Sequence, residues 1–105
     1  EKQFAHARQV NRPLILTELG CPSHDYAIRT PHAWPGPDRV ADPARQQKAY
    51  RAMVQALQRT GAVQGVWIWK FVTTQDSYER QNLSRGFLMR GKAAEAEIRK
   101  LWSGG

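Results

Sequence analysis

Two short apolar runs, each bounded by residues that interrupt regular structure, predict the strands of this protein. The first strand is predicted over residues 12–19 (RPLILTEL) and the second over residues 64–71 (QGVWIWKF). Nearly every position in the two runs is apolar, whereas a strand with one solvated face would alternate apolar and polar residues. We therefore expect both strands to be buried on both faces, as in parallel sheets that are covered by helices.

Three further segments have apolar residues at helical spacing. The chain opens on the end of one helix, and the last helix is predicted over residues 92–102. The middle helix, residues 42–60, has Asp42 as its N-cap, Pro43 in the first helical position and Gly61 as its C-terminal stop. The order helix, strand, helix, strand, helix predicts an α/β fold with a βαβ crossover. Because two parallel strands make a poor sheet, we expect further strands outside this chain.

The composition adds a size limit and excludes several classes of protein. With 105 residues the chain has room for one small domain, and its four Trp, three Tyr and three Phe favour an ordered chain over a disordered one. One cysteine cannot form an internal disulfide, and no apolar run approaches the roughly 20 residues of a membrane helix. The net charge of +7 comes from basic residues that are scattered along the chain. Since they form no run of five like charges, we predict neither a nucleic-acid partner nor a membrane partner.

The candidate chemistry lies at the carboxyl ends of the two predicted strands, where ligands gather in parallel α/β folds. Glu18 is the last polar residue of the first strand, and the side-chain period of two places it on the same face as Leu16. Trp67 and Trp69 share a face of the second strand, with Trp67 lower in the strand and expected to be core. A carboxylate beside an aromatic ring suits carbohydrate chemistry. The carboxylate attacks or stabilises an oxocarbenium-like centre, while the ring covers the apolar side of a sugar.

Several short motifs follow one another along the chain in an informative order. RPLILTELG (12–20) is similar to a "KP-(apolar)-TE-(apolar)-G" strand, and GVWIW (65–69) forms the core of the second strand. DPARQQKAY (42–50) begins the helix between them, while GF (86–87) and RGKAA (90–94) are similar to a "GY…RGKPA" ending. Together they resemble strand seven, the following helix, strand eight and the ending of retaining (β/α)8 glycoside hydrolases. The resemblance is greatest to the family 113 mannanase-like group, and it covers nearly the whole chain.

This resemblance implies that residues 1–105 form one partial domain, the C-terminal βαβα part (strands seven and eight) of a TIM (β/α)8 barrel. In such a hydrolase Glu18 would be the catalytic nucleophile, Trp69 would floor the subsite of the scissile sugar, and Trp34 would be a further sugar-binding residue. Trp34 lies in the proline-rich stretch 20–41, whose length itself favours a functional loop. The implied substrate is a β-linked poly- or oligosaccharide, and neither a cofactor nor a metal is implied.

The resemblance also implies that the chain is incomplete as a catalyst. In this clan the acid/base glutamate comes from strand four, and no part of this sequence matches that strand. A whole barrel takes about 250 residues. We therefore expect a fragment that carries half of the catalytic pair, is inactive alone and needs the remainder of the barrel. Relatives are often exported bacterial enzymes, but any signal peptide would precede Glu1, so the localisation stays open.

Each candidate residue also has a structural interpretation. Glu18 could be hydrogen-bonded at the end of a strand, Trp69 could be core, and Trp34 could pin its loop. Lys70 stands where relatives often have an acidic or polar residue, which leaves open an inactive member of the family. The segment TELGCP (17–22) also resembles the non-catalytic barrel modules of phage-tail and gene-transfer-agent proteins.

The loop contains two other groupings of reactive side chains. His24, Asp25 and His32 are metal-ligand types, but their spacing fits no common ligand pattern, so we predict no metal site. Cys21 and His24 form a nucleophilic dyad on paper. Because nothing in the sequence orients them toward each other, Cys21 is interpreted as a small packing residue.

Overall fold

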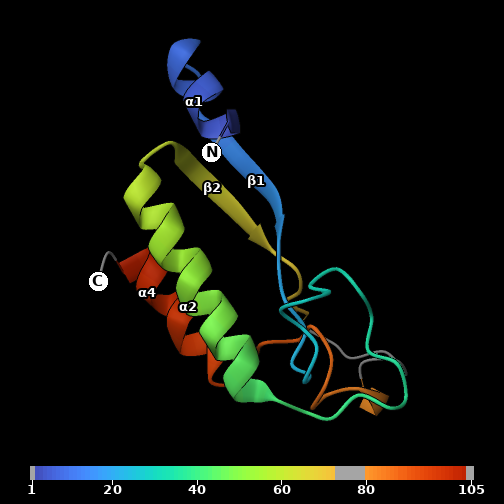
Figure 1. Ribbon diagram of the computed structural model, residues 1–105. Coiled ribbons are helices and arrows are strands. Elements are labelled where there is room, and N and C mark those ends of the chain that lie inside the picture. Colours follow the sequence, from blue (N-terminus) through green and yellow to red (C-terminus); the bar gives the residue numbers. More distant parts are fainter. Residues whose placement is uncertain (1, 73–79, 104–105) are drawn as a thin grey trace.

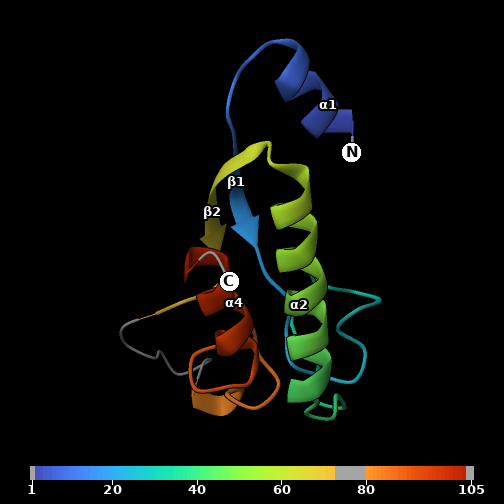
Figure 2. The same cartoon turned by 90° about the vertical axis from the view of Figure 1, so that its left-hand side faces the viewer.

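The computed structural model describes residues 2–72 and 80–103, in which two helices pack on a two-stranded sheet (Figure 1). The elements in chain order are α1 (Lys2–Gln9), β1 (Leu14–Leu19), α2 (Pro43–Thr60), β2 (Val63–Ile68) and α4 (Ala94–Ser103). Helices α2 and α4 lie side by side against one face of the sheet (Figures 1 and 2). Helix α1 lies beyond the start of β1, at the opposite end of the sheet from the long loops.

Helix α2 is specified at both ends by local signals. The Asp42 carboxylate accepts a hydrogen bond from the backbone N–H of Arg45 (2.9 Å), and Pro43 occupies the first turn, where its missing N–H costs nothing. Bonds from the side chain and backbone of Arg45 hold the pKa of the Asp42 carboxyl below its ordinary value. The helix ends at Gly61, which has a φ of 60° in the left-handed region that favours glycine. The helix predicted over residues 42–60 thus agrees with the observed α2, which has Asp42 as its N-cap and spans Pro43–Thr60.

The two strands pair in parallel, as the βαβ order predicts. Strand β1 begins at Leu14 rather than at residue 12, because Leu14 pairs with Val63, the first residue of β2. Residues 12 and 13 precede any partner strand and lie outside the ladder. Strand β2 in turn begins one residue before the predicted 64.

Strand β2 ends at Ile68, three residues before the predicted end at Phe71. The ladder closes with a hydrogen bond from the Trp69 N–H to the Leu19 carbonyl oxygen (2.8 Å). Leu19 is the last residue of β1, so in the described part of the chain residues 70–72 have no partner strand to pair with. The Trp69–Lys70 peptide bond is cis.

An irregularity in β1 determines where Glu18 lies. Leu16 pairs with Val66 and Leu19 pairs with Ile68, so β1 uses three residues where β2 uses two. The extra residue is a β-bulge, and it interrupts the alternation of faces, leaving Thr17 and Glu18 both exposed. The prediction that Glu18 shares a face with Leu16 is therefore wrong, because a one-residue register shift moves the following side chains to the other face.

The core lies where α2 and α4 pack against the connecting loops, with Ile68 of β2 packed against it. It combines residues of α2, α4 and the connecting loops: Cys21, Ala27, Tyr50, Val54, Met89, Ala94 and Ile98. The other face of the sheet is uncovered in the described residues, where Ile15 is 55% and Trp67 72% exposed. The predictions that both faces are buried and that Trp67 is core are therefore wrong for this chain. Over residues 2–72 and 80–103, one helical layer covers the sheet.

Helix α4 begins at Ala94, two residues after the predicted start at 92, and extends to Ser103. Lys92 lies just before the helix, and its ammonium group contacts the loop that follows β1. It donates hydrogen bonds to the Ser23 hydroxyl (2.7 Å) and to the Gly86 carbonyl oxygen (3.2 Å). These bonds tie the start of α4 to the loop that follows β1.

A buried carboxylate joins the two helices. Glu97 of α4 is 2% exposed and accepts hydrogen bonds from Arg51 Nη2 (2.9 Å) and Gln47 Nε2 (3.1 Å) of α2, and from Lys100 Nζ (3.0 Å). These donors, with Arg51 the strongest, lower the pKa of the Glu97 carboxyl to about 2. The group is therefore charged in the folded protein and links α2 to α4. None of the helices in the described part of the chain is long and apolar enough to cross a membrane.

Candidate active site

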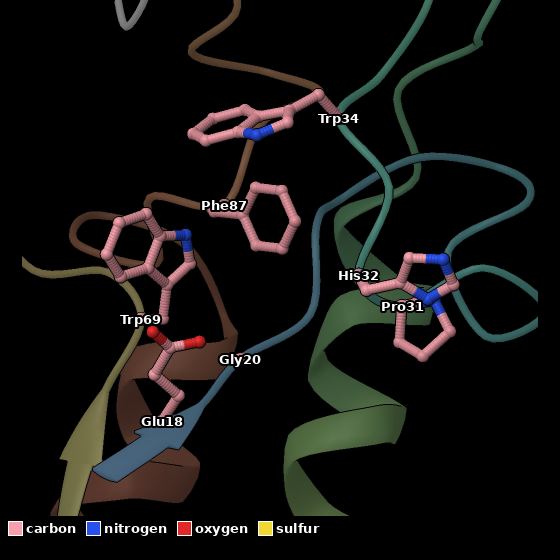
Figure 3. A pocket seen from close by; sticks show the side chains of 7 residues that line it. All are labelled: Glu18, Gly20, Pro31, His32, Trp34, Trp69 and Phe87. Carbon is pink, nitrogen blue, oxygen red and sulfur yellow. The ribbon is translucent and has the colours of Figure 1, made fainter.

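A pocket of about 370 Å³ lies at the carboxyl ends of the two strands. Its walls come from β1, from the residue after β2, from the β1–α2 loop and from the segment before α4 (Figure 3). The lining residues are Glu18, Gly20, Pro31, His32, Trp34, Trp69 and Phe87. This is the end of the sheet at which the sequence predicts the chemistry. The three residues predicted to act there, Glu18, Trp69 and Trp34, all line the same pocket.

Glu18 projects its carboxylate into the pocket toward Trp69 (Figure 3). The bulge in β1 directs the side chain to the uncovered side of the sheet, as bulges often do next to functional sites. Within the described ranges the Glu18 carboxylate forms no hydrogen bond or ion pair. The carboxylate is thus not a structural cap of the strand, and its oxygens face the pocket.

Trp69 is held in place by its backbone, directly after β2. Its N–H donates to the Leu19 carbonyl oxygen (2.8 Å), and its own carbonyl oxygen accepts a bond from the Tyr50 hydroxyl (3.4 Å). Gly20 packs against this carbonyl group and leaves no space for a side chain. The indole ring itself is 40% exposed, so Trp69 is a pocket wall rather than core.

Trp34 reaches the same pocket from the β1–α2 loop. Its ring lies edge-on to Trp69 (centroids 6.4 Å apart, 76° between planes) and to Phe87 (4.9 Å, 71°). The ammonium group of Lys70 lies 5.3 Å from the Trp34 ring centroid and 5.8 Å from that of Trp69. Because Trp34 is still 47% exposed, its ring is a second apolar surface at the pocket rather than only an anchor of its loop.

The sequence did not identify Phe87, Pro31 or His32 as pocket residues. Phe87 is 3% exposed, and its ring packs against that of Trp34 from the segment before α4. The available signal was the Gly86-Phe87 motif, in which Gly86 is required because a Cβ there would lie 2.9 Å from the Asn82 carbonyl oxygen. His32 lines the pocket from an exposed position, so it contributes to the walls rather than to a metal site.

The other reactive groups of the loop are structural. His24 is 2% exposed, and its Nδ1 accepts a hydrogen bond from the Tyr26 N–H (3.1 Å), so this nitrogen carries no proton. Burial lowers the pKa of His24 and keeps the ring neutral. Burial raises the pKa of the Cys21 thiol to about 11, so it is not a nucleophile near neutral pH. No group of three His, Cys, Asp or Glu side chains in residues 2–72 and 80–103 is arranged to hold a metal ion.

The chemistry available to these walls is that of a single carboxylate between aromatic rings. Glu18 is the one acidic residue among the described lining residues. It can attack or electrostatically stabilise a cationic carbon, while Trp69 and Trp34 cover the apolar faces of a ring-shaped ligand. Hydrolysis with retention also requires a second carboxyl about 5–5.5 Å away as acid and base. The described lining of the pocket does not supply it.

Comparisons with known proteins agree with this arrangement. The model of Glycoside Hydrolase Family 113 matches residues 2–92. A solved structure described as that of a GH113 β-1,4-mannanase superposes with a TM-score of 0.80 at 22% identity, over 99% of this chain and 33% of that chain. The GH113 β-mannanase AaManA from Alicyclobacillus acidocaldarius, in complex with ManMIm, gives a TM-score of 0.77 at 21% identity, over 99% and 33%. Among curated protein sequences no significant match is found.

These matches define how much of the fold is present. The chain spans about one third of the length of the two mannanase structures and nearly all of it is used in the superposition. The prediction of an α/β chain that forms part of a (β/α)8 barrel is confirmed.

Proposed function

The chain belongs to glycoside hydrolase family 113, and we propose that it contributes one half of the active site of a retaining hydrolase that cleaves β-1,4-linked mannan or mannooligosaccharides. In this proposal Glu18 is the nucleophile, Trp69 floors the subsite of the scissile sugar, and Trp34 is a second sugar-binding surface. The acid/base carboxyl comes from outside this chain. The names of the similar structures, both β-mannanases, support the choice of substrate.

The observation that carries the proposal is the position of Glu18 opposite Trp69 at the carboxyl end of the strands (Figure 3). Catalytic groups of (β/α)8 enzymes lie at this end of the barrel. The carboxylate is unpaired in the described residues and faces a pocket whose other walls are largely aromatic. A structural carboxylate would instead be hydrogen-bonded to the backbone or to a basic side chain.

The chemistry follows from one carboxylate acting on a bound glycoside. A Glu18 oxygen attacks the anomeric carbon, and the bond to the leaving sugar breaks as the acid/base carboxyl protonates the departing oxygen. The resulting glycosyl–Glu18 ester is then hydrolysed by a water molecule that the same acid/base group deprotonates. Trp69 stacks on the sugar and excludes bulk water, which strengthens the electrostatic attraction between the carboxylate and the cationic transition state.

We further propose that the chain is inactive alone and depends on the remainder of the barrel. The uncovered face of the sheet, where Ile15 and Trp67 are exposed, supports this dependence because a contiguous apolar face normally packs against further structure. The barrel would supply strands beside β1 and β2 and the second carboxyl at their common end.

The test is the replacement Glu18→Gln in the full-length protein that contains this chain. Hydrolysis of β-1,4-mannan should fall by about 10³-fold or more, the loss typical of removing a group that acts in the chemical step. A 2-deoxy-2-fluoromannosyl fluoride should label the wild-type protein covalently, and peptide mass spectrometry should locate the label on Glu18. The matched control is Glu95→Gln, which neutralises an acidic residue of α4 outside the pocket and should leave activity unchanged.

Three outcomes would contradict the proposal. Glu18→Gln with undiminished hydrolysis, or a label on another residue, would remove Glu18 from the nucleophile role. Wild-type protein that binds mannooligosaccharides but does not cleave them would favour a non-catalytic barrel module instead.

A further inference from the structure

The β1–α2 loop, which carries Trp34 to the pocket, is closed at its base by backbone pairing. The Asp25 N–H donates to the Val40 carbonyl oxygen (2.9 Å), and the Asp42 N–H donates to the Ser23 carbonyl oxygen (2.8 Å). These bonds fix where the loop leaves and returns to the core. Between Trp34 and this base lies the 36–39 turn, which leads directly into Val40.

Among the described residues, Arg85 of the segment before α4 is the side chain that donates hydrogen bonds to the backbone of the 36–39 turn. Arg85 Nη1 lies 3.1 Å from the Gly36 carbonyl oxygen, 2.8 Å from that of Pro37 and 3.3 Å from that of Arg39. Its Nη2 donates to the side-chain oxygen of Asn82 (3.1 Å), which orients the guanidinium plane. The guanidinium group is planar, permanently charged and has several N–H donors, so it can hydrogen-bond to several carbonyl oxygens of one turn.

This arginine and Trp34 belong to one local unit. Trp34 lies two residues before Gly36, the first carbonyl that Arg85 binds. On the other segment, Phe87 lies two residues after Arg85, and its ring is 4.9 Å from the Trp34 ring. The segment around Arg85 therefore contacts the loop both at the turn beside Trp34 and at the indole ring itself.

We propose that Arg85 is a positioning residue for substrate binding: by holding the carbonyls of the 36–39 turn it keeps Trp34 at the pocket, and so determines how strongly the sugar subsite formed by Trp34 binds. Arg85 is not among the residues that line the pocket, so in this proposal it does not contact the substrate. This inference rests on the proposed function, because it assigns a role in sugar binding to a residue that acts through Trp34.

Arg85 orders the 36–39 turn before a sugar binds. Without the guanidinium, three carbonyl oxygens lose a charge-assisted donor, and the turn has no other described side chain donating to it. Fixing the loop would then cost conformational entropy at the moment of sugar binding rather than during folding. The cost falls on binding and not on the chemical step at Glu18, because the base of the loop and the strand ends are held by separate bonds.

The experiment is a double-mutant cycle in the full-length protein with β-1,4-mannotetraose as the probe. Arg85→Ala should raise KM about tenfold while kcat changes less than about threefold, the pattern expected when binding rather than chemistry is weakened. In a Trp34→Ala background the same replacement should change KM less than about twofold, since there is no indole left to position. Arg85→Lys should give an intermediate KM, because an ammonium group supplies three donors without the planar fork.

A second readout keeps the inference separate from the proposed activity. Acrylamide quenching of Trp34 fluorescence, obtained by difference between proteins with and without Trp34, should increase in Arg85→Ala even without sugar. Arg99→Ala is the matched control, since it removes an arginine that pairs with Glu95 on the surface of α4, and it should change neither KM nor quenching.

The outcomes distinguish the two proposals. Unchanged quenching and an Arg85→Ala effect of equal size with and without Trp34 would overturn the positioning role, even in an active enzyme. If the wild-type protein neither binds nor cleaves mannotetraose, the proposed function fails, and the quenching measurement still decides whether Arg85 orders Trp34. If Arg85→Ala does not fold, the Arg85→Lys variant carries the same comparison.

Discussion

Gly20 lies directly against the backbone carbonyl group of Trp69. A Cβ atom at position 20 would lie 3.0 Å from the Trp69 carbonyl carbon and would clash with its oxygen. The same carbonyl oxygen accepts the hydrogen bond of the buried Tyr50 hydroxyl (3.4 Å). The residue that follows β1 thus sets how closely Trp69 approaches the end of β1, where Glu18 lies.

Replacing Gly20 by Ala should therefore move Trp69 and disturb the pocket. The obstacle is backbone, which cannot swing aside as the end of a flexible side chain can, so we expect a loss of about 1–3 kcal/mol in the free energy of unfolding. A shift of the indole by about 1 Å should also reduce kcat/KM by up to about 10²-fold. Urea unfolding and mannan hydrolysis by the full-length protein measure the two effects.

The control for this replacement is Gly65→Ala in the neighbouring strand. A Cβ at Gly65 would lie 3.6 Å from side-chain atoms of Ile15, an ordinary contact distance. Stability and activity should remain close to wild type. Equal losses in the two variants would show that the contact between Gly20 and Trp69 has no special role.

The ring of Trp69 should matter for substrate more than for folding, because it is 40% exposed at the pocket. In the full-length protein Trp69→Ala should lower kcat/KM at least about tenfold, which corresponds to about 1.4 kcal/mol of lost stacking. Trp69→Phe, which keeps an aromatic surface, should lose less. Trp102→Phe alters an exposed indole of α4 outside this pocket and should leave kcat/KM unchanged. A Trp69→Ala enzyme with wild-type kcat/KM would refute a role in the subsite.

The link between α2 and α4 through Glu97 should depend on pH. The folded-state pKa of Glu97 is about 2, below the ordinary value of 4.5, so its contribution is fully present above about pH 4.5 and is lost as the pH falls toward 2. Glu97→Gln should lower the free energy of unfolding by about 2 kcal/mol at pH 7, because charge-assisted bonds to a buried group are lost. The difference between the two proteins should shrink steadily below pH 4.

Glu95→Gln is the comparison for this measurement. Glu95 lies on the same helix but pairs with Arg99, whose side chain is 77% exposed, so solvent weakens the pair. Its loss of stability should be clearly smaller than that of Glu97→Gln. A difference between Glu97→Gln and wild type that stayed constant down to pH 2 would contradict the assignment of a low pKa to Glu97.

The 105-residue chain by itself should not unfold in one cooperative transition. In the described residues its sheet has two strands and Trp67 is 72% exposed on the uncovered face. Stable sheets need further strands or a covering layer on each apolar face. Urea unfolding followed by circular dichroism, with size-exclusion chromatography, should show a broad transition or self-association. A sharp two-state transition in a monomer would instead mean that this chain completes its own core.

Local features of the sequence were enough to predict most of the fold. Asp42, Pro43 and Gly61 act on the backbone within one or two residues, so the ends of α2 can be read from them alone. The apolar runs likewise predict the strands, since a strand without alternating polarity belongs to a parallel sheet. Their limits could not be predicted, because a strand ends where its partner ends, as β2 does at the last residue of β1.

The candidate site was predictable in part. Glu18 and Trp69 follow from the rule that parallel strands present their carboxyl ends at one edge, and Trp34 from the resemblance of the ordered motifs. Phe87 and Arg85 are not predictable, because Phe87 contacts Trp34, and Arg85 the turn after it, across more than 45 residues of chain. Their effect depends on the path of two loops relative to each other, which no local pattern encodes.

The order of the elements, the caps of α2, the parallel pairing and the carboxylate at the end of β1 follow from the amino-acid sequence alone. These depend on the period of apolar residues and on short-range backbone chemistry. Three other features arise from the folded arrangement: a bulge turns Glu18 away from the face of Leu16, Gly20 leaves room for the Trp69 carbonyl group, and Arg85 holds the loop of Trp34. Each of these depends on contacts between segments distant in the chain, where a shift of one residue or one ångström changes which side chains meet.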